Sequence, residues 1–152
     1  MLYMKNLFKF NNKVIKFFLH NNCKKMTISV LGYTLFYRIC ILIMPNKILE
    51  KMLGEKGMET LYDESAENLD TARHIASLIN YIAPHTPWES KCLVCAMTTQ
   101  KILDNHGIRS TLYLGLKKED NSMVAHAWLR CGPLYLTGGN GNGYATVAKY
   151  TK

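Results

Sequence analysis

Residues 90–116 decide the fold, and they read SKCLVCAMTTQKILDNHGIRSTLYLGL. As far as Asn105 the apolar residues recur every three or four positions, which is the spacing of a helix with one buried stripe. Ser90 is a favourable N-cap for this helix, and Gly107 is placed to stop it. From Ser110 onward the period becomes two, as in a strand with one buried face. The sequence therefore predicts a helix that leads directly into a strand.

Three more strands are expected after this one. Strand-like alternation is present in residues 124–130, 134–137 and 144–150. Turn residues separate these segments at 118–122, at 131–133 and in the glycine-rich run 138–143. Consecutive strands joined by short turns form antiparallel pairs. Because helices are expected only before this sheet, the predicted fold class is α+β.

The N-terminal third of the chain is basic, and the remainder is neutral. Residues 1–51 hold nine Lys or Arg residues and one acidic residue, whereas residues 52–152 hold ten of each kind. A nucleic-acid-binding domain carries its basic residues over the folded surface. A nucleic-acid partner is therefore not expected.

Two helices are expected in the basic third. Residues 1–22 have an amphipathic pattern, which fits a helix packed on its own domain, on an anionic membrane surface or in a partner's groove. Residues 28–44 are more apolar, but Arg38 divides them into runs well short of the roughly 20 residues that a membrane span needs. We expect a buried helix that ends near Pro45, with peripheral membrane contact as the alternative.

The middle of the chain suggests a boundary between two parts. Residues 50–70 are expected to be an acidic, partly helical connector. An apolar helix follows at residues 75–82, and residues 84–90 form a rigid loop with two prolines. We therefore expect a helical, basic N-terminal segment at residues 1–69 and the main domain at residues 70–152.

The cysteine count indicates the compartment. The chain has an odd number of cysteines, namely Cys23, Cys40, Cys92, Cys95 and Cys131. No secretory signal is evident, because the apolar stretch starts only near Ile28 and no small-residue cleavage site follows it. A cytoplasmic chain with reduced thiols is expected, and association with the membrane surface is the alternative. In such a chain a cysteine is a core residue, a metal ligand or a nucleophile.

Cys92 and His126 are the best candidates for nucleophilic catalysis. Cys92 falls in the first turn of its helix, where unpaired backbone N–H groups and the helix dipole favour a thiolate, and Lys91 lies beside it. A nucleophile also needs a base within reach. His126 lies on an expected strand, which fixes the direction of its side chain, whereas the other histidines lie in helices, at a helix end or in the proline loop.

Two alternatives remain open from the residues alone. Cys92 and Cys95 form a CxxC pair, and a zinc site would add His126 and Cys131 as further ligands. A redox CxxC should follow a strand, whereas here a proline loop precedes it. Cys95 lies one helical turn below Cys92, where a core position is expected. The other alternative is a non-catalytic, membrane-associated scaffold that acts through the basic N-terminal helices.

Four motifs occur in order along the second half of the chain. They are PWESKCL at residues 87–93, GI with LYLG at 107–108 and 112–115, AHAW at 125–128, and TGG at 137–139. Together they resemble the lasso-peptide maturation proteases, the transglutaminase-like leader peptidases of lasso-peptide gene clusters. The resemblance covers about residues 70–150. It implies a papain-like or transglutaminase-like fold, in which the nucleophile opens a helix packed on an antiparallel sheet.

The resemblance also implies roles for individual residues. Cys92 matches the family's nucleophile and His126 its general base. Trp128 matches the tryptophan of the histidine motif, which packs in the core. Pro87 and Trp88 match the loop before the nucleophile, where they would wall the cleft. The backbone N–H of Cys92 would supply part of the oxyanion hole.

The residue that orients the histidine departs from the family pattern. The family has an aspartate on the strand after the histidine strand, but this chain has no acidic residue after Asp120. Hairpin geometry sets His126 roughly opposite Thr137 or the residue after it. Asn140 is the preferred candidate, since asparagine has this role in papain-type sites. Thr137, Asn142, a backbone carbonyl or an earlier acid are the alternatives.

The implied function is removal of the leader from a ribosomally made lasso-peptide precursor, before a separate cyclase closes the macrolactam. No cofactor or metal is implied. The N-terminal part is expected to be helical and so lacks the strands of a winged-helix leader-binding module. The expected partners are therefore the precursor peptide, a separate leader-binding protein and the lasso cyclase.

Overall fold

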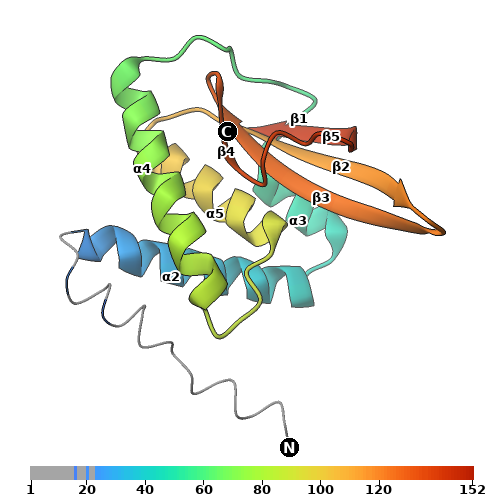
Figure 1. Cartoon of the computed structure of the whole chain (residues 1–152), viewed down its shortest axis with the longest axis horizontal. Coiled ribbons are helices and arrows are strands. Elements are labelled where there is room, and N and C mark those ends of the chain that lie inside the picture. The colour runs from blue at the N-terminus through green and yellow to red at the C-terminus, as the bar shows by residue number, and fades with distance from the viewer. Residues whose placement is uncertain (1–15, 17–19, 21–22) are drawn as a thin grey trace, which may run out of the picture.

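The computed structural model describes Lys16, His20 and residues 23–152. The amphipathic helix predicted for residues 1–22 lies outside this part, apart from those two residues. The described elements are α2 (Lys24–Ile43), α3 (Asn46–Leu53), β1 (Glu55–Lys56), α4 (Ala66–Ile82), the short 3-10 helix η1 (Ala83–His85), α5 (Cys92–Asn105), β2 (Thr111–Glu119), β3 (Ser122–Cys131), β4 (Leu134–Thr137) and β5 (Ala145–Thr151). Apart from the two-residue β1, the helices precede the strands, which confirms the α+β class (Figure 1).

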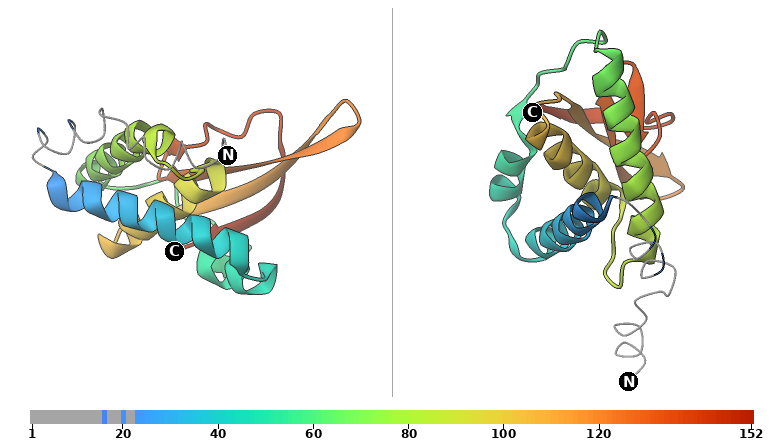
Figure 2. Two further views of the ribbon diagram at one scale, coloured as in Figure 1. Left: turned by 90° about the horizontal axis from the view of Figure 1, so that it is seen from below. Right: turned by 90° about the vertical axis from the view of Figure 1, so that its left-hand side faces the viewer.

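The sheet has five strands in the order β1-β5-β2-β3-β4, and all neighbours are antiparallel. Helices α2, α4 and α5 lie on one side of it, with α5 in the centre (Figures 1 and 2). The core between the layers includes Val30, Ile75, Ile79, Met97, Leu103, Leu112 and Leu129. α5 (Cys92–Asn105) contacts both other helices of this layer and three of the strands, so it forms the centre of the fold.

The strands predicted from alternation are all present. β4 has the predicted bounds, and β5 begins one residue later than expected. The β2–β3 hairpin is longer than the pattern suggested, because the pairing continues to Glu119 and Ser122 at its tip. Asp120, in the tight turn, has a φ of +49°. This long hairpin projects beyond the rest of the sheet (Figure 1).

α2 is present as predicted and ends just before Pro45. The prediction that it is buried is wrong for one of its faces. Val30 and Tyr37 are buried against the other helices, whereas the opposite face exposes large apolar side chains. The reason is that the described residues of the domain cover only one side of the helix. By length and composition α2 could cross a membrane, yet 28% of its most apolar stretch is buried within the fold.

α4 begins earlier than the apolar pattern indicated. Ser65 is its N-cap, and the Ser65 hydroxyl accepts a hydrogen bond from the Asn68 N–H at 3.2 Å. The boundary expected between residues 69 and 70 falls inside this helix. The connector at 50–70 contains the end of α3, β1 and an extended segment, residues 57–64, which we call the strap.

The sequence predicted the C-terminal end of α5 correctly but not its N-cap. Lys91, not Ser90, is the N-cap, and no side chain caps the helix. The Ser90 hydroxyl lies instead 2.9 Å from the hydroxyl of Thr86 in the preceding loop. At the other end Gly107 has a φ of +71°, and the Ile108 N–H donates back into the last turn at 3.0 Å, as expected for a glycine stop.

The face of the sheet turned away from the helices has its own buried residues. Tyr113 of β2 and Trp128 of β3 are paired there, with stacked rings 5.5 Å apart. Arg130 is fully buried on the same face, although arginine is rarely buried without partners. It donates to the Tyr113 hydroxyl at 2.9 Å and to the carbonyls of Thr60 and Gly132 at 2.8 and 2.7 Å. Because Thr60 belongs to the strap, Arg130 ties the strap to the sheet.

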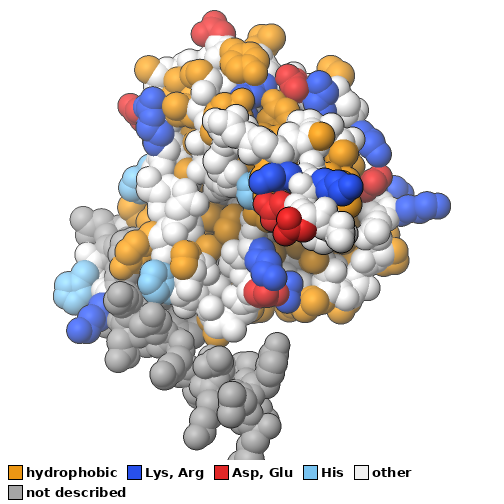
Figure 3. Space-filling model, turned by 45° about the vertical axis from the view of Figure 1, so that its right-hand side comes forward, with side chains coloured by type: hydrophobic (Ala, Val, Ile, Leu, Met, Phe, Trp, Pro, Cys, Tyr) orange, Lys and Arg blue, Asp and Glu red, His pale blue; other side chains and the backbone are white. Residues whose placement is uncertain are grey.

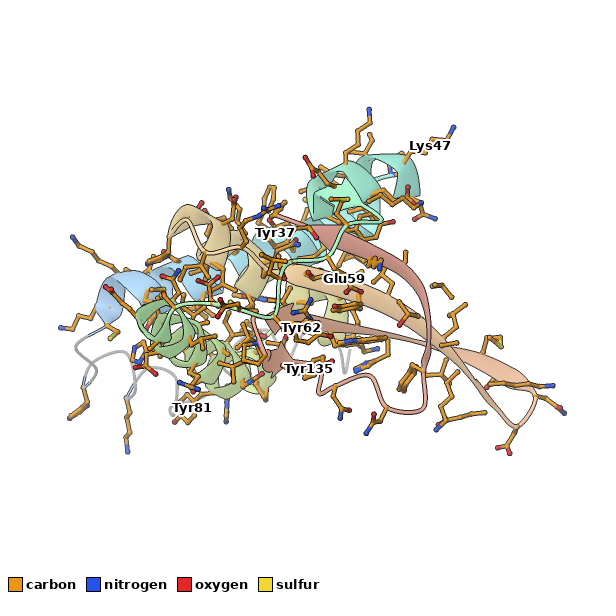
Figure 4. The ribbon with its side chains drawn as sticks, turned by 90° about the horizontal axis from the view of Figure 1, so that it is seen from above. Tyr37, Lys47, Glu59, Tyr62, Tyr81 and Tyr135 are labelled. Atoms are coloured by element: carbon orange, nitrogen blue, oxygen red, sulfur yellow. The ribbon has the colours of Figure 1, made fainter. Side chains whose placement is uncertain are left out.

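Arg130→Ala should lower the free energy of unfolding by about 3–5 kcal/mol, because it leaves buried carbonyls and a buried hydroxyl unpaired. The guanidinium also lies 4.0 Å from the ring centre of Tyr62 in the strap (Figure 4), and this contact is lost as well. Urea unfolding measures the effect. The matched control is Arg73→Ala, which removes an exposed pair with Asp70 and should cost less than about 1 kcal/mol. Equal losses in both variants would contradict this role of Arg130.

Candidate active site

Cys92 is the first residue of α5 and is half-buried. The first turn of the helix contains no acidic residue and has no side-chain cap. Its first backbone N–H groups therefore keep their partial positive charge, which can stabilise an oxyanion that forms at this position. Within residues 23–152 the Cys92 thiol is neither in a disulfide nor in a side-chain hydrogen bond.

The loop before Cys92 is fixed by charged side chains. Glu89 accepts from Lys91 at 2.7 Å and from Arg38 of α2 at 2.7 Å. These contacts, with the Lys91 hydrogen bond first, lower the pKa of the exposed Glu89 carboxyl. The charge of Lys91, which we expected to act on the thiol, is therefore engaged by Glu89. The backbone of the helix end is left as the main source of positive potential at Cys92.

Cys95 and Cys131 are in the environment of core residues. Cys95 packs against the core, and its thiol donates to the Ser90 carbonyl at 3.3 Å. Burial, and secondarily Cys92, raises the pKa of Cys95 to about 11. Burial, and secondarily Glu64, raises the pKa of Cys131 to about 11. Both thiols are therefore protonated at neutral pH, which makes them poor nucleophiles.

Alkylation with iodoacetamide at pH 8 should modify Cys92 at least tenfold faster than Cys95 or Cys131. At three units below a pKa of about 11, only about one thiol in a thousand is ionised. Peptide mass spectrometry over a time course gives the three rates. Faster labelling of Cys95 than of Cys92 would move the nucleophile to the second position of the pair.

His126 lies on the outer face of β3, opposite Gly115 of β2. Its Nε2 is 2.7 Å from the carbonyl oxygen of Gly138. A carbonyl oxygen only accepts, so Nε2 carries the proton and the neutral ring keeps its lone pair at Nδ1. The ring centre is 4.8 Å from that of Tyr144 and 6.0 Å from that of Trp128. The imidazole is thus held in one tautomer with Nδ1 as the basic atom.

The acceptor that faces His126 is a main-chain carbonyl and not a side chain. Asn140 accepts from the Asn142 N–H at 3.1 Å and so closes its own turn. The Thr137 hydroxyl is buried and has no hydrogen-bond partner among the described residues. Within residues 23–152, the side chains of Thr137, Asn140 and Asn142 form no hydrogen bond with the His126 imidazole. The geometry therefore favours the carbonyl alternative, which carries no net charge.

Gly138 is suited to this close approach because it has no side chain. Its φ is +73°, and a Cβ would collide with the carbonyl oxygen of Ala127 and lie 3.0 Å from the Cα of Trp128. Gly139 is similar in conformation, with a φ of +68°, but a Cβ there would meet nothing within 4 Å. An alanine at either position would strain the backbone, but only an alanine at Gly138 would also collide with a neighbouring residue.

Gly138→Ala should displace the carbonyl and release the His126 ring, whereas Gly139→Ala should not. Both variants should lose about 1–2 kcal/mol of stability from the left-handed backbone conformation. Long-range proton–nitrogen NMR of the imidazole should show one tautomer, protonated at Nε2, in the wild type and in Gly139→Ala. In Gly138→Ala the two tautomers should be mixed. An unchanged His126 spectrum in Gly138→Ala would remove the carbonyl from the site.

Cys92 and His126 are not hydrogen-bonded to each other within the described residues. Five residues separate the end of α5 from the start of β2, and α5 runs back beneath the sheet (Figure 1). Cys92 packs on the inner core, whereas His126 is on the outer face. β4 pairs with β3 only from Leu129 onward, so the edge of β3 beside His126 is not covered by β4. Catalytic hydrogen bonds are often long before substrate binds.

The donors of the alternative zinc site, namely Cys92, Cys95, His126 and Cys131, do not converge. Cys131 is buried in the inner core, and His126 lies on the other face of the sheet. Within residues 23–152, no three His, Cys, Asp or Glu side chains are grouped so that they could hold a metal ion. The CxxC pair therefore has no third ligand beside it in the described part of the chain.

The structure adds residues that sequence reasoning missed. Trp128 packs in a buried position as implied, but on the outer face together with Tyr113 and Tyr144. Tyr144 was not singled out, although it contacts the His126 ring. Trp88 is half-buried in the loop before Cys92, and its indole N–H has no partner among the described residues.

Comparison with known protein families identifies the superfamily to which this chain belongs. The model of the Transglutaminase-like superfamily matches residues 47–151, from α3 to the last residue but one. No curated protein and no solved structure matches the chain. The match begins before the domain start expected at residue 70 and includes Cys92 and His126. Since it covers more than half of the sequence and agrees with the helix-then-sheet architecture, the chain belongs to the transglutaminase-like superfamily.

Proposed function

We propose that this chain is a cysteine peptidase that removes the leader from a lasso-peptide precursor. Members of its superfamily are typically cysteine peptidases or acyltransferases. The observation that carries the proposal is the Nε2–H bond of His126 to the Gly138 carbonyl. It leaves Nδ1 as the ring atom that can act as a base. The PWESKCL and AHAW motifs support the lasso-peptide subfamily.

The chemistry follows from these groups. Nδ1 of His126 takes the thiol proton, and the Cys92 sulfur attacks the carbonyl carbon at the leader–core junction. The negative oxygen of the tetrahedral intermediate is stabilised by the backbone N–H groups at the start of α5. The imidazolium then gives its proton to the departing amine, and the C–N bond breaks.

Water completes the reaction. It attacks the thioester, His126 accepts a proton from the water, and the Cys92 sulfur leaves and is reprotonated. The leader is released with a new carboxylate, and the core peptide is released with a new N-terminal amine. That amine is the group a separate cyclase needs to close a macrolactam.

Recognition of the leader is assigned to a separate protein. The described N-terminal part of the chain consists of α2 and α3 and contains no strand before β1. We propose that a small leader-binding protein holds the precursor and that the cyclase takes the product.

The experiment is a single-turnover cleavage assay with the full chain and precursor, followed by mass spectrometry. Cleavage of one bond at the leader–core junction, in the presence of the leader-binding protein, is expected. Absence of cleavage with that protein present would contradict the peptidase proposal. Cleavage at the full rate without it would contradict only the proposed partner.

A further inference from the structure

The exposed face of α2 is a continuous apolar surface with no cover among the described residues. Its large side chains recur at steps of one, three, four or seven residues, and we call them the apolar stripe: Ile28, Leu35, Phe36, Ile39, Leu42 and Ile43. Leu42 is 64% exposed and Ile43 is 71% exposed. These positions share one side of a helix. The stripe spans about 22 Å along the helix axis.

This surface is unusual for a helix that is already packed in a domain. The opposite side of α2 buries Val30 and Tyr37 and provides Arg38 for the ion pair with Glu89. α2 is therefore held in place, and its apolar stripe faces outward. Contiguous exposed apolar patches of this kind mark sites of contact with a partner or a membrane.

Basic residues lie at both ends of the stripe. Lys24 and Lys25 precede Ile28 by four and three residues, so they lie on the same side of the helix. Lys47 and Lys51 of α3 follow the other end, and Figure 4 shows Lys47 at the outer end of α3. All four are exposed, and within residues 23–152 none of them is in an ion pair.

The charge around the apolar stripe distinguishes between three partners that could cover it: a second copy of α2, the residues before Lys24 and a membrane. A second copy of α2 would bring more lysines to these ends and no acids, because the first acidic residue of the chain is Glu50. The residues before Lys24 contain no acid either. In contrast, the face seen from the β2–β3 hairpin mixes basic and acidic side chains (Figure 3). The one acid beside the α3 end of the stripe, Glu50, is in an ion pair with Lys56 at 3.6 Å. An apolar stripe flanked by four lysines that are unpaired among the described residues is complementary to lipid tails beneath anionic headgroups.

We propose that α2 docks this protein on an anionic membrane surface. The helix lies parallel to the membrane plane, with the stripe at the level of the upper acyl chains. The lysines at its ends contact the headgroups. The inference is independent of the peptidase proposal, since it concerns a face of α2 and not the residues of the site.

The test is sedimentation of the full chain with vesicles of phosphatidylcholine containing phosphatidylglycerol, compared with phosphatidylcholine alone. The wild type should bind the anionic vesicles, and binding should weaken as salt is raised. Ile39→Glu and Leu42→Glu should each reduce the partition coefficient about tenfold or more. Lys24→Gln together with Lys25→Gln should reduce it by about fivefold per lysine.

The matched control is Met123→Glu, which changes an equally exposed apolar residue, 62% accessible, near the hairpin tip. It should bind like the wild type, and circular dichroism should show all variants folded. Equal vesicle binding by Ile39→Glu, Leu42→Glu and the wild type would place binding elsewhere and overturn the proposal. A dimer in light scattering that Leu42→Glu abolishes, without vesicle binding by the wild type, would overturn it in favour of a second copy.

Discussion

Cys92→Ala should abolish leader cleavage, with a fall in the single-turnover rate of about 10⁴-fold or more. The sulfur forms the covalent bond to the substrate, and no neighbouring group can replace it. Cys95 lies one turn away, but burial raises its pKa to about 11 and its thiol faces the Ser90 carbonyl. The rate is measured with enzyme in excess over precursor, at fixed leader-binding protein.

Cys95→Ala is the matched control for this prediction. It removes a sulfur from the same helix and should cost on the order of 1 kcal/mol of stability. Its cleavage rate should stay within about threefold of the wild type, a difference of less than 1 kcal/mol in the barrier. If Cys92→Ala retained activity and Cys95→Ala lost it, the mechanism would have to start from the buried thiol.

His126→Ala should slow cleavage by about 10³- to 10⁴-fold, the upper range for loss of a general base. The variant loses the Nδ1 atom that takes the thiol proton, and it also loses the ring contacts with Tyr144 and Trp128. Added imidazole should restore part of the rate, because a small base can occupy the vacated space. Rescue distinguishes lost proton transfer from a damaged fold.

Asn140→Ala is the informative comparison for His126→Ala. If the Gly138 carbonyl orients the imidazole, Asn140 acts only by closing its turn onto Asn142, and its loss should slow cleavage about tenfold at most. Asn140→Asp keeps the accepting oxygen and should be close to the wild type. A fall for Asn140→Ala as large as that for His126→Ala would return the third position to the asparagine side chain.

The strands were predictable because alternation depends on residues that are neighbours in sequence. β4 was predicted with its bounds, and Gly107 was predicted to end α5, since both signals are local. The N-cap of α5 was not predictable. Ser90 has the right chemistry, but its hydroxyl is engaged by Thr86, and that contact depends on the path of the proline loop.

The remaining differences arise from contacts that sequence periodicity does not encode. An all-round apolar helix such as α2 has no pattern that says which face the domain will cover. A carbonyl acceptor has no residue type of its own, so Gly138 was visible only as one of two glycines after a strand. Arg130 lies on the same face of β3 as Trp128 and His126, but its burial depends on the strap, which lies far away in sequence.

The Arg38–Glu89 pair joins a helix outside the family match to the loop before Cys92, the proposed nucleophile. α2 also packs on α4 and α5, so it completes the helical layer of the domain. The segment that identifies the family is therefore shorter than the unit that folds. A chimaera that exchanges residues 47–151 with those of a relative would place the relative's loop against this α2. The ion pair between α2 and the loop before Cys92 would then be lost. Recombination between members of this superfamily should give a folded protein only when α2 is exchanged together with residues 47–151.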